Sequence, residues 1–161
     1  MKRYKEIKKP AETNALNKLE IIKFYQKLST KSMRKFKGDF DRKEFGSLDK
    51  MYIMPSNEFY DIAQNNQTLA FFRVRDFSIY VNADTVKNPD FSAIMLHELA
   101  HTRNYRLSIE ELIKEIDEMK VILEEDNFWG GDAYSQKDSR YELQETHSNV
   151  YVRFKMMGHT L

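Results

Sequence analysis

Two histidines and a glutamate interrupt an apolar run in the stretch AIMLHELAHTRNY, residues 93–105. On an α-helix, His97 and His101 lie about 40° apart around the axis and one turn apart along it, so both imidazoles can reach one metal ion. Glu98 lies about 100° from His97, beside the line of ligands, where a carboxylate can hold a metal-bound water. The spacing therefore predicts a helix with two metal ligands and a general base. The alternative is an ordinary helix that carries two histidines.

The absence of cysteine restricts the ligands of any metal ion to nitrogen and oxygen atoms. The 161 residues, 41% of them apolar, are the size of one domain with a core, so we expect a single domain over 1–161. No window reaches the roughly 18 apolar residues that a membrane span needs, and no apolar segment follows the basic start as in a secretion signal. The sequence thus predicts a cytoplasmic protein without a membrane anchor.

Charge is divided unevenly along the chain, although the net charge is only +1. Residues 1–50 contain 15 Lys or Arg and 7 Asp or Glu, a charge of +8, and residues 51–161 carry −7. A basic segment of this kind can dock on an acidic domain, attract nucleic acid or form a solvated helix. Base-stacking aromatic residues are not interleaved with the lysines, so we favour the solvated helix and do not expect a nucleic-acid partner.

The apolar pattern predicts an α+β fold with a small, mostly antiparallel sheet packed on the helix of the two histidines and on further helices. Residues 12–29 have helical spacing within a basic, mainly helical segment over 1–45, and residues 35–47 are expected to form a loop or a short helix with a turn. The runs KMYIMPS, TLAFFRV and FSIYVNA are rich in aromatic and β-branched residues. They predict three strands, of which the last two form a hairpin.

Three helices are predicted after the sheet, over about 89–104, from Ser108 onward, and from near Ser135 or Asp138 onward. Asn88 can cap the first of them, with Pro89 at the first helical position, where a missing N–H costs nothing. Ser108 and Glu111 have the spacing of a capping box at the start of the second helix.

The residues alone leave the third metal ligand open. Glu142, Glu145 and Asn149 fall on one face of the predicted third helix. His147 points about 200° away from Glu145, so these two side chains cannot bind the same ion from a regular helix. A third histidine ligand would have to be His147 or His159, because the chain has four histidines in all.

The HELAH sequence on a capped helix after a small sheet resembles the active-site helix of the zincin metallopeptidases. The metzincin type would need glycine at position 104 and histidine at position 107, where this chain has Asn104 and Leu107. The stretch LQETHSNVY, residues 143–151, is similar to the gluzincin E-x-x-S-D pattern. By that match Glu145 is the third zinc ligand, and Asn149 stands where the family has an aspartate that orients a ligand histidine. The order of elements looks most like that of the ImmA/IrrE-type peptidases of phage and mobile-element regulation.

This resemblance implies a zinc metalloendopeptidase that hydrolyses peptide bonds of a protein partner, such as a repressor, inside the cell. Zn²⁺ would be held by His97, His101 and Glu145, and Glu98 would be the general base. In zincins the peptide substrate lies along the edge of the sheet, and FSIYVNA is the strand that we expect there.

The sequence leaves one catalytic role and two other functions open. The group that stabilises the oxyanion is not identified, and the candidates are Tyr134, Tyr141, His147, His159 and Arg103. One alternative is a weakly active or inactive zinc-binding protein of the zincin fold that acts by binding a partner. The other is a nucleic-acid-binding regulator that works through the basic residues 1–50.

Overall fold

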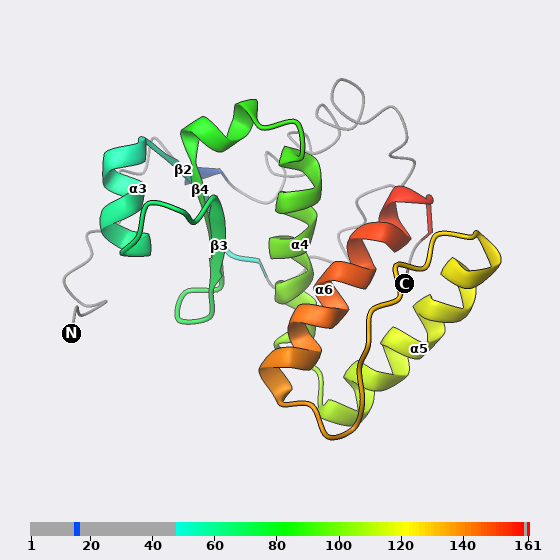
Figure 1. The fold of residues 1–161 in the computed structure, drawn as a ribbon. Helices are drawn as coiled ribbons and strands as arrows, with labels where there is room; N and C mark the ends of the chain where they lie inside the picture. Colours follow the sequence, from blue (N-terminus) through cyan, green and yellow to red (C-terminus); the bar gives the residue numbers. More distant parts are fainter. Residues whose placement is uncertain (1–14, 17–47, 160) are drawn as a thin grey trace.

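The computed structural model describes residues 15–16, 48–159 and 161, and it has an α+β fold (Figure 1). The strands are β1 (Ala15–Leu16), β2 (Met51–Met54), β3 (Ala70–Arg73) and β4 (Ser78–Asn82). The helices are α3 (Ser56–Ala63), the short 3-10 helix η3 (Ala83–Lys87), α4 (Phe91–Asn104), α5 (Ile109–Glu125) and α6 (Arg140–Met156). The α+β class predicted from the sequence is confirmed.

The sheet is mixed, in the order β1-β2-β4-β3, and two of its three described pairings are antiparallel, in line with the predicted mostly antiparallel sheet. The hairpin of β3 and β4 is antiparallel as expected, and the two-residue β1 pairs antiparallel with β2. At the centre of the sheet, however, β2 pairs parallel with β4. The reason is that α3 and β3 lie between these two strands in the sequence. They return the chain to the end of the sheet where β2 begins, so that β4 runs in the same direction as β2.

The expectation that FSIYVNA, residues 77–83, is the strand at the edge of the sheet is wrong. This run forms β4, which lies between β2 and β3 and is buried along its whole length. The sheet ends in β1 at one edge and in β3 at the other, and α4 packs against β3. A run that is apolar on both faces is typical of an interior strand, because both of its faces are covered.

Both faces of the sheet are covered, since successive side chains of a strand point to opposite sides. In β4, Ile79 and Val81 belong to the core that α4, α5 and α6 share, whereas Tyr80 belongs to a smaller cluster with Phe59 and Ile62 of α3. Figure 1 shows the same arrangement, with α3 and α4 on either side of the sheet and α6 between α4 and α5. The helix that carries the histidines is therefore held between the sheet and α6.

The predicted start of the helix of the two histidines is off by two residues, because α4 begins at Phe91. The side chain of Asn88 accepts a hydrogen bond from the backbone N–H of Asp90 at 2.8 Å, and Asn88 also ends η3. Asn88 therefore caps a turn that precedes the helix, and Pro89 lies in that turn. Neither η3 nor α3 was predicted from the sequence.

Capping boxes start the two long helices that follow. Ser108 and Glu111 form the predicted box at the start of α5. The third predicted helix starts later than expected, at Arg140, behind a second capping box of Ser139 and Glu142. The two expected starting residues form a turn instead, in which the backbone N–H of Ser135 donates to the Asp138 carboxylate at 3.1 Å.

Most of the basic segment predicted over 1–45 lies outside the described residues, as do residues 35–47. The helix predicted over 12–29 is not helical at Ala15–Leu16, which form β1, and its remaining residues are also outside the description. Across the part of the chain that the structure describes, no helix combines the length and the apolar character needed to cross a membrane.

Candidate metal centre

The helix α4 brings three potential metal ligands together, as the spacing of the sequence predicts. One ligand atom from each of His97, Glu98 and His101 lies within 4.8 Å of the others. The two imidazole rings stand edge to face with their centroids 5.1 Å apart. His101 is buried and His97 is partly exposed, with side-chain exposures of 6% and 22%, so the group lies at the rim of the helix packing.

A fourth side chain reaches the same point from α6. The Glu145 carboxylate has one oxygen 2.9 Å from His97 Nε2 and the other 3.4 Å from His101 Nε2. Ligand atoms of a tetrahedral zinc ion at bond lengths of about 2.0–2.1 Å stand about 3.3 Å apart. Each of the two Glu145 oxygens thus lies near one histidine nitrogen, at a separation close to that between ligands of one tetrahedral ion.

The charges of this group influence one another strongly. Hydrogen bonds from His101 and His97 lower the pKa of the Glu145 carboxyl far below its usual range. Burial would lower the pKa of His97, but the contact with Glu145 and the nearby Glu98 charge outweigh burial, so this pKa is raised. Glu145 is thus an anion beside two imidazoles, which is the electrostatic environment of a cation site.

Glu98 lies beside the ligand group but has different contacts. Burial raises the pKa of Glu98, and His101 and His97 oppose that shift only in part. The backbone of Phe72, in the edge strand β3, donates a hydrogen bond to the Glu98 carboxylate. Glu98 is therefore held between the sheet edge and the histidines, and a raised pKa makes it a stronger acceptor of a proton.

The other residues that the sequence left open as third ligands are occupied elsewhere. Glu142 is exposed and closes the capping box with Ser139. His147 is fully buried on another face of α6, and its Nε2 lies 2.9 Å from a Glu115 oxygen. His159 Nε2 lies 2.6 Å from an Asp126 oxygen. The structure does not bring any of these three to His97 and His101.

Four of the five candidates for oxyanion stabilisation are also engaged. His147 and His159 have the partners just named, Tyr134 donates to Asp117, and Arg103 forms a two-pronged ion pair with Glu115. Tyr141 differs, because it is 64% exposed and its hydrogen-bond partner is Glu145 of the site itself. It lies one turn before Glu145 on α6, so its hydroxyl is at the mouth of the site.

Asn149 and Ser148, the other residues of the similarity to the gluzincin pattern, contact one histidine each. The exposed Asn149 side chain hydrogen-bonds His97 and helps to raise its pKa. The fully buried Ser148 Oγ lies 3.3 Å from His101 Nδ1. The sequence interpretation missed a closer neighbour, Asn104, whose Oδ1 lies 3.0 Å from His101 Nδ1. The available signal was its position three residues after His101, on the same helix face.

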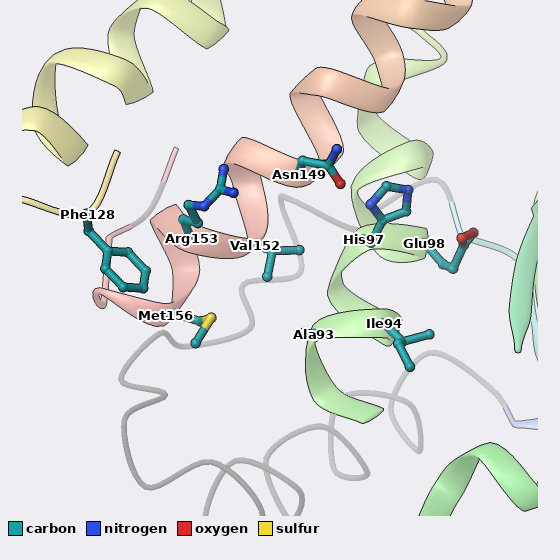
Figure 2. A pocket seen from close by; sticks show the side chains of 9 residues that line it. All are labelled: Ala93, Ile94, His97, Glu98, Phe128, Asn149, Val152, Arg153 and Met156. Atoms are coloured by element: carbon teal, nitrogen blue, oxygen red, sulfur yellow. The ribbon is translucent and has the colours of Figure 1, made fainter. Parts of the chain in front are cut away.

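A cavity of about 520 Å³ opens beside His97 and Glu98. Figure 2 shows side chains of α4 on one side of it and of α6 on the other, with Phe128 and Arg153 at the end away from His97. Its wall is largely apolar and includes Ile94, Val152, Met156 and Phe128. Arg153 forms an ion pair with Asp132. The size and lining are those of a pocket for a small molecule or for one or two side chains of a larger partner.

Comparison of the chain with protein-family models, with curated proteins and with solved structures gave no match. The resemblance to the zincins therefore rests on the residues of this chain. What the structure supports is the coarser statement that His97, Glu98 and His101 form an H-E-x-x-H arrangement on one helix, within reach of a single metal ion.

Proposed function

We propose that the chain is a zinc-dependent metallopeptidase of the zincin type that hydrolyses peptide bonds of a protein partner. The observation that carries the proposal is the approach of Glu145 on α6 to His97 and His101 on α4, at 2.9 and 3.4 Å. These three side chains offer two nitrogens and an oxygen to one ion, while Glu98 stays beside them. Three ligands plus one uncommitted carboxylate is the composition of a hydrolytic zinc site.

A metal ion explains this arrangement better than histidines in an ordinary helix do. Without a metal, the two imidazole nitrogens can face the Glu145 carboxylate only by donating a proton to it, and a metal ion can take the place of these protons between the same three groups. The donor set contains no thiolate and includes two imidazoles, which favours zinc over calcium or magnesium. Zinc bound there would lower the pKa of a coordinated water to near 7 and polarise a carbonyl group.

Glu98 supplies the proton transfer in this proposal. Its carboxylate lies within 4.8 Å of the histidine ligand atoms, so it can hydrogen-bond a water molecule at the same point. The raised pKa suits a group that takes a proton from water and later gives it to the leaving amine. The Phe72 backbone N–H holds the Glu98 carboxylate from the side of the sheet.

Tyr141 is the residue that we assign to the carbonyl oxygen of the substrate. Its hydroxyl reaches Glu145, so a shift of a few ångströms, within the freedom of an exposed side chain, turns the donor toward a carbonyl beside the ligands. A phenol that donates to this oxygen as negative charge develops stabilises the transition state more than the bound substrate.

The cavity beside His97 and Glu98 gives the class of substrate. Its apolar wall suits large apolar side chains, and the edge strand β3 offers backbone groups to an extended peptide. A protein segment with apolar residues next to the cleaved bond is therefore the proposed substrate. A cytoplasmic protein partner, as in the ImmA/IrrE-type peptidases, belongs to the same proposal.

Metal content and cleavage by the Glu98→Gln variant test the proposal. Mass spectrometry of the purified protein should find about one zinc per chain. A peptide library should be cut by the wild type and about 100-fold more slowly, or not at all, by Glu98→Gln, which keeps the metal but cannot accept the proton. Glu118→Gln, an exposed position on α5, is the matched control and should cut at the wild-type rate.

Three outcomes would overturn all or part of the proposal. A protein that takes up no zinc from supplemented medium has no zinc site. Equal cleavage by Glu98→Gln shows that Glu98 is not the base. Zinc without cleavage by either protein favours the alternative of an inactive zinc-binding protein that acts by binding a partner.

A further inference from the structure

A series of hydrogen bonds leads to His101 through the contact between α4, α5 and α6. We call it the buried polar chain, and its members are Arg103, Glu115, His147, Asn104 and His101. Arg103 Nε and one terminal nitrogen donate to the Glu115 carboxylate at 2.9 and 2.6 Å. The same carboxylate lies 2.9 Å from His147 Nε2. His147 Nδ1 lies 3.3 Å from Asn104 Nδ2, and Asn104 Oδ1 lies 3.0 Å from His101 Nδ1. Asn104 and His147 are fully buried.

The two ends of the buried polar chain have fixed hydrogen-bonding roles. A guanidinium group can only donate, and an ionised carboxylate can only accept. Because Glu115 accepts, His147 must carry its proton on Nε2 and present a lone pair on Nδ1. That lone pair takes an N–H of Asn104, which leaves the amide oxygen of Asn104 as an acceptor for His101. The acceptor fixes the proton of His101 on Nδ1.

Two further contacts hold the Asn104 amide in this orientation. Its nitrogen lies 3.1 Å from the backbone oxygen of Gln144 and 3.0 Å from Ser148 Oγ. If the amide turned over, its oxygen would face the Gln144 carbonyl oxygen and the lone pair of His147, and three acceptors would meet without a hydrogen between them. A buried arrangement of that kind costs free energy at each unpaired group. The orientation of Asn104 is therefore set by α6 as well as by Glu115.

We propose that the buried polar chain positions His101, holding its proton on Nδ1 and its Nε2 lone pair toward the metal. Nε2 is the nitrogen that lies 3.4 Å from Glu145, on the side away from Asn104. An imidazole in solution can carry its proton on either nitrogen, so part of the population would otherwise present an N–H to the ion. Asn104, His147 and Glu115 are positioning residues, because they act through His101. The inference rests on the zinc site of the proposed function, and it does not depend on peptide hydrolysis.

Nitrogen NMR of the wild-type protein labelled with ¹⁵N-histidine tests this directly. With a chelator present, His101 should carry a proton on Nδ1, and His147 should carry its proton on Nε2 and not on Nδ1. Addition of zinc should shift the His101 Nε2 resonance and leave its Nδ1 protonated. A neutral His101 with its proton on Nε2 would overturn the proposal, whether or not the protein binds zinc. The absence of zinc binding would instead overturn the proposed function.

Two variants of Asn104 separate positioning from simple packing. Asn104→Leu removes the acceptor, so His101 should no longer prefer to carry its proton on Nδ1. Zinc affinity should then fall roughly 10-fold to 100-fold. Asn104→Asp restores the acceptor for His101 and should restore the His101 spectrum and most of the zinc affinity. It should also lower stability, because its second oxygen faces the Gln144 carbonyl oxygen and cannot donate to His147. If the leucine variant does not fold, the wild-type spectrum and the aspartate variant still test whether Asn104 holds the proton of His101 on Nδ1. Zinc affinity equally weak in Asn104→Asp and Asn104→Leu would show that packing alone is at work.

Discussion

Replacement of Glu115 by glutamine should remove an acid-sensitive part of the free energy of unfolding. The Glu115 side chain is 14% exposed and accepts hydrogen bonds from Arg103 and His147. Burial would raise the pKa of Glu115, but these contacts outweigh burial and lower the pKa from 4.5 to about 2. Because the folded state binds this proton less readily than the unfolded chain, the ionised carboxylate stabilises the fold above pH 4.5. This stabilisation is lost as the pH falls toward 2.

The size of the effect follows from the pKa of Glu115. Each pKa unit corresponds to about 1.4 kcal/mol, so the full contribution of the ionised group is about 3 kcal/mol. About 2 kcal/mol of this is lost between pH 7 and pH 3, where the unfolded chain is already protonated but the folded carboxyl group is still mostly ionised. Glutamine does not titrate. The advantage of the wild type over Glu115→Gln should therefore shrink by about 2 kcal/mol between pH 7 and pH 3.

Urea unfolding at several pH values between 7 and 3, with a chelator present, measures this difference. Urea adds no ionic strength, and the linear dependence on its concentration gives the free energy of unfolding of each protein. Glu118→Gln makes the same substitution on an exposed face of α5, without the contacts to Arg103 and His147, and should show a much smaller change with pH. A gap between wild type and Glu115→Gln that stays constant from pH 7 to pH 3 would refute the reasoning.

The remaining predictions concern the zinc site. Glu145→Ala should weaken zinc binding, measured by competition with a chromophoric chelator, more than Asn149→Ala does, because Asn149 orients His97 without touching the ion, and its loss should cost roughly 10-fold. The opposite ranking would remove Glu145 from the ligand set. Tyr141→Phe should lower kcat and leave zinc affinity unchanged. The loss should be only roughly 10-fold to 100-fold, because solvent weakens the hydrogen bond that an exposed hydroxyl donates. The control is Tyr134→Phe, and a Tyr141→Phe variant that loses zinc and keeps kcat would make Tyr141 a support of Glu145 only.

Local patterns in the sequence were enough to find the elements whose stability is local. The capping box of Ser108 and Glu111 is a property of four consecutive residues, so α5 starts where the sequence indicates. Ser139 and Glu142 have the same spacing, but Ser135 and Asp138 offered a competing start, and only the folded chain shows that they form a turn. The helix α3 was missed because its two buried apolar residues mean little until the sheet lies beneath them.

Long-range pairing is the part of the fold that the sequence did not specify. The runs of aromatic and β-branched residues fix where strands form, but nothing in them states that β2 pairs with β4 in parallel. The prediction from the sequence therefore put β4 at the edge of the sheet. In the structure, Ser78 through Asn82 are all buried, as in a strand with a neighbour on each side. The crossover through α3 and β3 decides this order, and it acts over more than twenty residues.

The candidate site also has a part that local sequence predicts and a part that depends on how the helices pack. His97, Glu98 and His101 come together because one helix spaces them, so their arrangement could be predicted from five residues. Glu145 was proposed from a resemblance, and its approach to the histidines depends on how α6 packs on α4. Asn104 was noted only for what it excludes, because its contact with His101 gains meaning from groups that α5 and α6 bring to it.

The helix α5 connects the two helices that carry the proposed ligands. The proposed ligands come from α4 and α6, and Glu115 of α5 binds Arg103 of the first helix and His147 of the second. The three helices are thus joined at one carboxylate, behind the ring of His101. A movement of α5 that breaks this junction would loosen the packing of α6, and both Glu145 and the two α6 contacts of Asn104 depend on that packing. At the proposed zinc site, metal affinity and the packing of the three helices should therefore be linked, so that bound zinc would stabilise the helix packing as well.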